Sequence, residues 1–421
     1  MPADWTALRD RLHALGARQE RYERDVINLI ASDNAVPGWR ERTRPYSGDM
    51  IQEGIAGARP FAGAAVHNEL ELLAAEVARA VFGVDHAVLQ PHSCSQANQA
   101  VYHCLLSPGD RVLALHFRSG GHLTHGMRKN FSGSLYDFRF YGVGADGVID
   151  YAAAREVARE FRPRLVVCGS SSYPWTYDVP ELRSICDEVG AELLLDLSHE
   201  AGLIAGGAFD CDLGLADAVT MSLDKTLRGP HGAAILCRAD LADRMDAAVH
   251  PGTQSSFPVR RLTDAAAALL ETRTERFAEY ARRSVDLARA LAGAFTAHAP
   301  GAAVGGGTDK HYFLLDTRRA FGLDGRTAEE RLERAGLLTN RQSLPSDRSN
   351  RIDAAGGVRI GTAWLSSCGY TTADVADLVA LVVGALTADP AVDGDVARDF
   401  AAVARPLDVR AATALDWTPR S

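Results

Sequence analysis

The chain has 421 residues, of which 47% are hydrophobic and 24% are charged, which is the composition of an ordinary globular protein. Because 421 residues exceed what one small core holds, we expect a large domain together with a smaller one. The formal net charge of -9 argues against nucleic acid or an anionic membrane surface as a partner.

The N-terminus and the cysteines narrow the class of protein further. No basic segment followed by an apolar run opens the chain, and no apolar run reaches the roughly 18 residues of a membrane span. We therefore expect a cytoplasmic protein. The seven cysteines are an odd number without CxxC spacing, and several lie in apolar strands, as in Val166-Val167-Cys168. This pattern favours buried thiols over disulfides or a zinc site.

Short apolar strands alternate with longer amphipathic stretches through the middle of the chain. Strands that are apolar on both faces and alternate with helices predict an α/β fold with a mainly parallel sheet covered on both sides. The predicted strands are 87–89, 111–115, 165–168, 193–196, 218–222 and 233–236, and the predicted helices between them include 95–106, 151–161 and 179–189.

The pattern changes after a long alanine- and arginine-rich helical stretch at about 259–295. Beyond Gly305-Gly306-Gly307 there are fewer strands, at 312–315 and 358–360, with helices around them, as in a small α+β domain. We therefore expect three parts: an N-terminal helical arm over 1–40, a large domain over 41–290 and a small C-terminal domain over 291–421.

Lys225 is the most informative residue of the chain. It follows the predicted strand 218–222, Asp196 ends the strand before that one, and the serine-rich segment Ser93-Cys94-Ser95 opens a helix upstream of both. Lysine condenses with an aldehyde, an acid keeps a pyridine nitrogen protonated, and a helix N-terminus takes a phosphate. The three segments together predict a site for pyridoxal 5′-phosphate, although a serine at a helix start is also a common N-cap.

The loop 120–126 places His122 and His125 between glycines. The two histidines could be metal ligands, but no third ligand is evident. The glycines indicate that the backbone closely approaches something flat, so a histidine stacked on an aromatic cofactor ring suits the loop better, and we expect no metal.

Arg359 lies in a short apolar strand, within Gly357-Val358-Arg359-Ile360-Gly361. Burying a guanidinium is costly without an anion, so either a protein carboxylate or a substrate carboxylate should face it. The sequence leaves both alternatives open. Glu53 has an uninformative local context by itself.

The order of these motifs along the chain resembles serine hydroxymethyltransferase, a family of fold-type-I pyridoxal phosphate enzymes. The similarity runs from about residue 27 to residue 369 and includes Leu29-Ile30-Ala31-Ser32-Asp33-Asn34, Asn130-Phe131-Ser132-Gly133 and Ser171-Ser172-Tyr173-Pro174. The resemblance implies an aminotransferase-like large domain with a mainly parallel seven-stranded sheet, and a smaller α+β C-terminal domain.

The resemblance also implies a role for each residue that matches a cofactor position of the family. Lys225 would be the Schiff-base lysine, Asp196 the partner of the pyridine nitrogen, and His122 the residue stacked on the ring. The other expected contacts surround the phosphate and the phenolic oxygen of the cofactor: Ser93, Cys94, Ser95, Ser171, His199, Ser255 and Ser256.

On the substrate side, Ser32 and Arg359 match carboxylate-binding positions. Glu53 matches an acid–base glutamate that the neighbouring subunit contributes, because the family is built on an obligate homodimer with shared sites. Ile51 and Phe61 occupy positions beside the substrate.

The chain departs from the family at several of these positions. Asp224 stands where the family has the histidine before the lysine, Ile51 replaces a tyrosine, and Pro60-Phe61 replaces a tyrosine pair. Ser255-Ser256 replaces a Gly-Gly, and the contact to the folate pterin near 345–347 is altered. Isoleucine, proline and phenylalanine offer no side-chain hydrogen bond, so the proton-handling groups around the substrate differ, with Asp224 among the expected catalytic residues.

We therefore expect a folate-independent relative that forms an external aldimine with the amino-acid portion of a specialised metabolite. It would cleave a bond at Cα or Cβ, by β-elimination of a thiolate or by decarboxylation and deamination, as divergent members do in lincosamide antibiotic biosynthesis. Alternatives are a genuine folate-dependent serine/glycine hydroxymethyltransferase and an L-threonine transaldolase. A regulator that borrows this fold is disfavoured because no basic helix-turn-helix pattern precedes residue 27.

Overall fold

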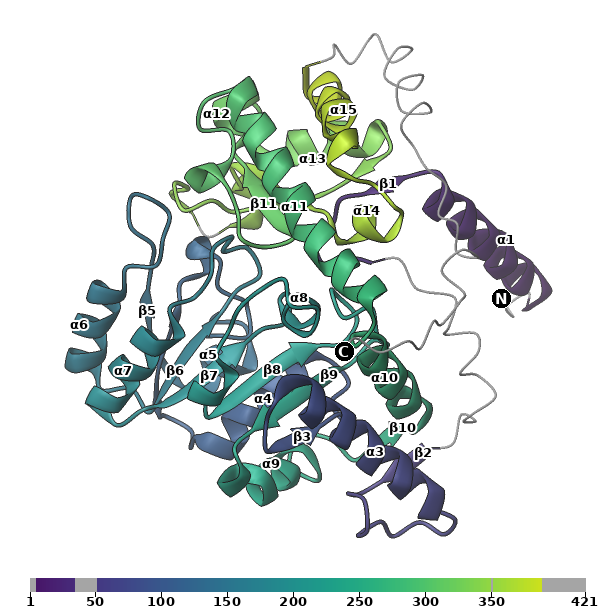
Figure 1. Ribbon diagram of the computed structural model, residues 1–421, viewed down its shortest axis with the longest axis vertical. Helices are drawn as coiled ribbons and strands as arrows, with labels where there is room; N and C mark the ends of the chain where they lie inside the picture. Colours follow the sequence, from purple (N-terminus) through teal and green to yellow (C-terminus); the bar gives the residue numbers. More distant parts are fainter. Residues whose placement is uncertain (1–4, 35–50, 350, 388–421) are drawn as a thin grey trace.

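A computed structural model of the chain describes residues 5–34, 51–349 and 351–387, which include a seven-stranded sheet and a three-stranded sheet (Figure 1). In the larger sheet β9 alone runs antiparallel to its neighbours, so the predicted mainly parallel seven-stranded sheet is confirmed. Its strands, in sheet order, are β3 (His86–Val88), β9 (Ala233–Cys237), β8 (Ala218–Ser222), β7 (Glu192–Asp196), β6 (Leu165–Gly169), β4 (Arg111–Leu115) and β5 (Asp137–Tyr141).

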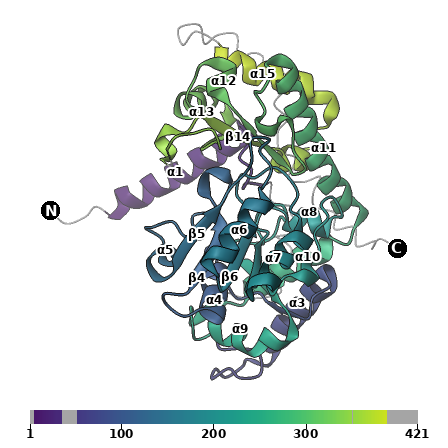
Figure 2. The ribbon, with the colours of Figure 1, turned by 90° about the vertical axis from the view of Figure 1, so that its left-hand side faces the viewer.

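Helices cover both faces of this sheet. Val166 of β6 packs into one apolar core and its neighbour Val167 into the other, because successive side chains of a strand point to opposite faces. Figure 2 shows α6 and α7 side by side over the first face. The helices of that face are α3 (Ala65–Phe82), α6 (Tyr151–Phe161), α7 (Val179–Val189), α8 (Ala201–Ala205) and α10 (Arg260–Glu271), and those of the second are α4 (Cys94–Leu105) and α9 (Ala242–Val249).

The three-stranded sheet is antiparallel and forms a separate apolar core with its helices. Its strand order is β11 (Tyr312–Leu315), β14 (Gly357–Gly361) and β13 (Asn340–Gln342), and the helices around it are α11 (Glu275–His298), α12 (Thr317–Phe321), α13 (Gly325–Arg334), α14 (Ala363–Ser367) and α15 (Val375–Thr387).

The other α-helices and strands of the described chain lie outside these two sheets. Helix α1 lies at the edge of the molecule in both views (Figures 1 and 2) and exposes Leu12 and Leu15. The remaining elements are α1 (Trp5–Arg24), β1 (Ile27–Asn28), which pairs with β12 (Leu337–Leu338), β2 (Ile51–Glu53), which pairs with β10 (Ser256–Pro258), and α5 (Phe131–Leu135).

Two sequence predictions need correction. The helical stretch predicted over 259–295 is two helices, because Thr274 accepts a hydrogen bond from the backbone of Phe277 and starts α11 anew. Strand β5 was not predicted, because it is an edge strand whose charged residues Asp137 and Arg139 break the apolar run.

The domain boundaries stay predictions. Residues 35–50 lie outside the described part of the chain, and position 290 falls inside α11, which contacts both β11 and α8. All seven cysteines are unpaired and four of them are buried, which confirms the expected thiols. Among the described residues, no helix combines the length and apolarity that crossing a bilayer requires.

Candidate active site

The predicted cofactor residues other than Ser255 and Ser256 meet in a cavity of about 180 Å³ at the carboxyl ends of β7 and β8. Ligands of α/β sheets bind where the carboxyl ends of parallel strands meet helix N-termini, which here is the start of α4. The cavity is lined by Ser93, Cys94, Ser95, His122, Ser170, Ser171, Asp196, Ser198, His199, Ser222, Asp224, Lys225 and His231.

Lys225 lies in the turn that follows β8. Thr226 holds this turn through a hydrogen bond from its hydroxyl to the carbonyl of His199, at 2.8 Å, and Arg228 has the left-handed φ of 60° at its far side. Burial lowers the pKa of the Lys225 amine, which favours the neutral, nucleophilic form.

Lys225 is also distinguished from the other lysines of this chain. There are three lysines in the sequence, and the other two are Lys129 and Lys310. Lys129 is exposed, whereas Lys310 is buried in an ion pair with Glu200. Lys225 is the one of the three that lines the cavity. An aldehyde bound there has one lysine to condense with.

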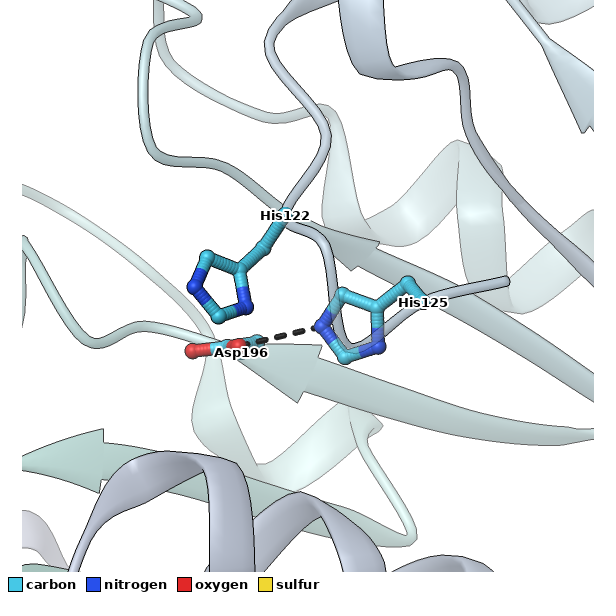
Figure 3. A group of neighbouring side chains, drawn as sticks. All are labelled: His122, His125 and Asp196. Atoms are coloured by element: carbon cyan, nitrogen blue, oxygen red, sulfur yellow. Dashed lines mark hydrogen bonds and ion pairs between the residues drawn. The ribbon is translucent and has the colours of Figure 1, made fainter. Parts of the chain in front are cut away.

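The second expected cofactor group, Asp196, is buried and closely held (Figure 3). Its carboxylate accepts hydrogen bonds from Asn98 Nδ2, at 2.8 Å, and His125 Nε2, at 3.0 Å. Burial alone would raise the pKa of Asp196, but the hydrogen bond and charge of His125 outweigh it and bring the pKa below its usual value. The carboxylate therefore stays charged and fits a protonated pyridine nitrogen.

The histidines of the glycine-flanked loop do have a third neighbour, which the sequence did not reveal. The ligand atoms of His122, His125 and Asp196 lie within 4.8 Å of one another. However, His125 uses both ring nitrogens, one on Asp196 and the other on the Tyr102 hydroxyl at 3.0 Å, and His122 Nδ1 lies 2.7 Å from Thr124 Oγ1. These bonds suit a histidine that holds an acid better than a metal site.

Glycine is required at positions 120 and 121 of that loop for a different reason from the one expected. A Cβ at Gly120 would lie 2.5 Å from the backbone nitrogen of Tyr173, and one at Gly121 would lie 2.0 Å from the carbonyl oxygen of Leu115. Gly120 and Gly121 thus lie against the backbone of the protein itself, and His122 is the residue of this loop that lines the cavity. Burial lowers the pKa of His122 to about 4, so its ring is neutral and suited to stacking on an aromatic ring.

Ser93 is an N-cap that also lies at the cavity, and its binding of a phosphate stays a prediction. Its hydroxyl caps α4 by accepting a hydrogen bond from the backbone of Gln96 at 3.3 Å, and it also lines the cavity. Ser95 is exposed beside it. Backbone N–H groups and serine hydroxyls at this helix start provide the donors that a phosphate requires.

Arg359, on β14 of the three-stranded sheet, lies beside the cavity and contacts two residues that line it, Ser171 and His199. Its guanidinium donates to the carbonyl of Ser171 and to Asn340 Oδ1, and it lies 3.4 Å from His199 Nε2. It forms no ion pair with a carboxylate in the part of the chain that the structure describes. Arg359 is only 7% exposed, and Asp33 stabilises its charge without forming an ion pair with it. A substrate carboxylate would supply that ion pair, which favours the second alternative of the sequence analysis. Ser32 follows Ala31, which packs against Gly361 at the end of the same strand.

Besides Ser32 and Arg359, five predicted residues do not line the cavity of their own chain. Glu53 and Ser256 face each other across the β2–β10 ladder, and the Glu53 carboxylate lies 3.7 Å from His250. Ile51 and Phe61 are 57% and 42% exposed. Ser255 precedes β10 and is exposed. Asp224, in contrast, lies at the cavity and contacts His231, which the sequence analysis did not single out.

The donor set fits pyridoxal phosphate. It comprises one lysine amine, a carboxylate kept charged, a neutral imidazole and serine hydroxyls at a helix N-terminus. In addition, Nδ1 of His199 is buried without a hydrogen-bond partner among the described residues, so this atom is available to the phenolic oxygen of the cofactor.

The buried histidines predict a pH-dependent stability. Burial lowers the pKa of His122 to about 4, that of His311 to about 3, and that of His199 well below its ordinary value. Unfolded histidine takes up protons below about pH 6.5, so this stability is complete above that pH and is lost as the pH falls toward 4, by up to about 1.4 kcal/mol per pH unit for each histidine.

Urea unfolding of the protein without added cofactor at about pH 7.5 and about pH 5 measures this loss. We expect a lower free energy of unfolding at the acid value and a weaker pH dependence in His122→Asn. Equal stability at both pH values would contradict the buried, neutral state of these rings.

In comparisons with known proteins, a family profile and the similar curated proteins carry the same name. The serine hydroxymethyltransferase family profile matches residues 10–382. Serine hydroxymethyltransferase of Levilactobacillus brevis is 37% identical over 390 residues, which are 91% of each chain. That of Mycobacterium avium is 39% identical over 386 residues, 90% of this chain and 89% of the relative. Serine hydroxymethyltransferase 1 of Mycobacterium tuberculosis is 38% identical over 394 residues, 91% and 89% respectively.

Proposed function

The chain belongs to the serine hydroxymethyltransferase family, whose members are pyridoxal phosphate-dependent enzymes acting on amino acids, and we propose its reaction from this premise. The enzyme cleaves and forms the Cα–Cβ bond of its amino-acid substrate, as in the conversion of serine to glycine. One observation carries this proposal. Buried Arg359 lies beside the cavity of Lys225 and Asp196, against the lining residue His199, and forms no ion pair with a carboxylate of the described chain. The name shared by the relatives favours hydroxymethyl transfer over the elimination or decarboxylation expected from the sequence.

Each residue then has a defined task. When bound, pyridoxal phosphate supplies an electron sink for the pair left on Cα after bond cleavage. Arg359 would orient the substrate through its carboxylate, and Asp196 would supply the negative charge that keeps the pyridine nitrogen protonated. Lys225 would hold the cofactor through its amine. Glu53, contributed by a second copy, holds the proton that leaves or returns at the Cβ hydroxyl.

A second copy of the chain is proposed because the site is incomplete without it. Glu53, Ser255 and Ser256 do not line the cavity of their own chain. Large apolar side chains are exposed on α3 nearby in sequence, a feature of surfaces that other proteins cover. These are Val66, Leu72 and Leu73, together with Ile51 and Phe61 before the helix and with Leu12 and Leu15 on α1.

Leu72→Glu is expected to weaken this homodimer at least tenfold, because Leu72 is 60% exposed in the monomer and a charge would be buried in the interface. Sedimentation equilibrium measures the change, and activity should fall in parallel at low protein concentration. Val148→Glu, at a 39% exposed position on a different segment, is the control and should leave association unchanged. A monomeric wild-type protein with full activity would refute the shared site.

A folate-independent reaction is the second candidate, and a specific observation favours it. Ile51 and Phe61 present no hydroxyl, and Asp224 Oδ2 lies 2.5 Å from His231 Nδ1 at the cavity. The groups that would move protons around Cβ are thus different from the tyrosines and histidine of the family pattern. β-Elimination of a thiolate, decarboxylation with deamination, and transfer of a glycyl unit from threonine to another aldehyde belong to this candidate.

Serine turnover with and without tetrahydrofolate separates the two candidates. Conversion to glycine at a rate on the order of 1–10³ per second that requires tetrahydrofolate supports hydroxymethyl transfer. Inactivity with serine combined with release of a thiol from cysteine conjugates, or with glycyl transfer from threonine, supports the folate-independent reaction. Failure of every amino acid to change the absorbance of the bound cofactor would exclude both.

A further inference from the structure

Lys310 and Glu200 form an ion pair whose side chains are both 0% exposed, with Nζ 2.6 Å from Oε1. Glu200 follows β7 of the seven-stranded sheet and precedes α8, whereas Lys310 lies two residues before β11 of the three-stranded sheet. The pair therefore joins the two sheets through the interior of the molecule. Neither Glu200 nor Lys310 is among the site residues expected from the sequence.

The surroundings of the pair fix its geometry. The ammonium of Lys310 donates to Glu200, to the Tyr177 hydroxyl at 2.7 Å and to Ser170 Oγ at 3.3 Å, so each of its three protons has an acceptor. Aromatic rings surround it at centroid distances of 4.1, 5.4, 5.7 and 6.0 Å: Tyr177, Tyr173, Phe209 and Tyr312. These acceptors and rings together fix the orientation of the Lys310 ammonium.

Stability alone is a weak reason for such a pair. Removing two charges from water costs several kcal/mol per ion, and apolar residues of similar volume often serve equally well. The second carboxylate oxygen of Glu200 is also buried without a hydrogen-bond partner among the described residues. Directional contacts that gain little stability are instead suited to fixing the position of neighbouring groups.

The neighbouring groups belong to the active site. His199 precedes Glu200 in the chain, and His311 follows Lys310. The rings of His199 and His311 stack at 5.5 Å with an interplanar angle of 22°, and Tyr312 meets His199 edge-on at 5.4 Å. Arg359 lies over the ring of Tyr312 at 5.7 Å and within 3.4 Å of His199 Nε2.

We propose that the Glu200–Lys310 pair is a positioning device that fixes the distance between His199, on the cofactor side of the cavity, and Arg359, on the carboxylate side. Glu200 is adjacent in sequence to His199, and Lys310 to His311, and the rings of these two histidines stack on each other. Loss of its directional bonds lets the three-stranded sheet shift relative to β7, and Arg359 moves with it. The inference rests on the proposed function in one respect, the binding of the substrate carboxylate by Arg359.

The test compares wild type with Glu200→Gln, Lys310→Met and the double variant Glu200→Leu/Lys310→Met, all loaded with pyridoxal phosphate. Three quantities are measured: the melting temperature, the dissociation constant of the cofactor, and the dissociation constant of glycine from the absorbance change of the bound cofactor. The single variants should melt at lower temperature, because each leaves its partner buried without its counter-charge.

The double variant is decisive. It removes both charges, and Tyr177 and Ser170 still have each other as hydrogen-bond partners at 2.8 Å. We expect its melting temperature and cofactor affinity to return close to the wild-type values, because most cofactor contacts lie on the seven-stranded sheet. The dissociation constant of glycine should remain raised by about 10- to 100-fold, the effect of misplacing a binding group by about 1 Å.

Arg289→Gln is the matched control, because it removes the exposed pair that Arg289 forms with Asp309, the residue before Lys310. This control should bind glycine as the wild type does. A stable double variant with wild-type glycine affinity overturns the inference. Should the wild type itself not respond to glycine, the proposed function fails separately, and crystal structures then judge the pair: a retained His199–Arg359 contact in the double variant overturns the inference, and a lost contact supports it.

Discussion

Lys225→Ala is expected to abolish covalent cofactor binding and to lower turnover by on the order of 10³-fold or more, because the amine that captures and releases pyridoxal phosphate is lost. The structure makes this expectation specific. Lys225 is the only one of the three lysines that lines the cavity, and burial lowers the pKa of its amine.

Borohydride reduction of the cofactor-loaded protein followed by peptide mapping shows directly which lysine carries the cofactor. The cofactor should be found on the peptide that contains Lys225 and be absent from the variant. Lys129→Ala, which changes an exposed lysine, is the control and should label and turn over as the wild type does. Labelling of Lys310 or Lys129 in the wild type, or unchanged turnover in Lys225→Ala, would show that the cavity is not the site of the chemistry.

Asp196→Asn is expected to lower turnover by about 10²- to 10³-fold while leaving the fold intact, because a neutral amide no longer stabilises a protonated pyridine nitrogen. Asn98 Nδ2 and His125 Nε2 both point at the Asp196 carboxylate. Both bonds go to Oδ2, whereas the hydroxyl and the backbone N–H of Ser198 donate to Oδ1. The single oxygen of an amide can face one of these two sets of donors only, so the absorbance of the bound cofactor should change as well. His125→Ala should produce a smaller change in the same direction, because Asp196 then loses the group that keeps its pKa low.

Asp217→Asn is the matched control for this prediction. Asp217 is 4% exposed, as Asp196 is. However, it precedes β8, at the end of that strand away from the cavity, and it pairs with Arg183 and Arg238. Its replacement should lower the melting temperature and leave the turnover of the folded protein unchanged. If both variants lose activity in proportion to their stability, the special role of Asp196 is wrong.

The local parts of the active site could be predicted from the sequence. An acid that ends one apolar strand, a lysine after another and serines at a helix start are each encoded within a few residues, so the pattern predicts both the elements and their chemistry. Ser93, Asp196 and Lys225 do line one cavity. The carboxyl ends of neighbouring parallel strands necessarily meet at one edge, as β7 and β8 do.

Partners from distant segments could not be predicted in this way. His125 lies 71 residues before Asp196, the acid that it holds, and nothing in the glycine-flanked loop distinguishes its role from that of His122. The carbonyl of Ser171 is 188 residues from Arg359. Each pairing depends on which strand lies beside which, and that is a property of the folded chain.

The sequence by itself thus determined the fold class, the cofactor and the family, because these follow from strand and helix periodicity and from reactive groups at the ends of elements. The tertiary structure decided how those groups are tuned and placed. It left Arg359 without a carboxylate partner among the described residues, put His125 against Asp196, and joined the two sheets through Glu200 and Lys310. Burial and hydrogen bonding change the charge and direction of a side chain, and both are set by neighbours that only the folded chain brings together.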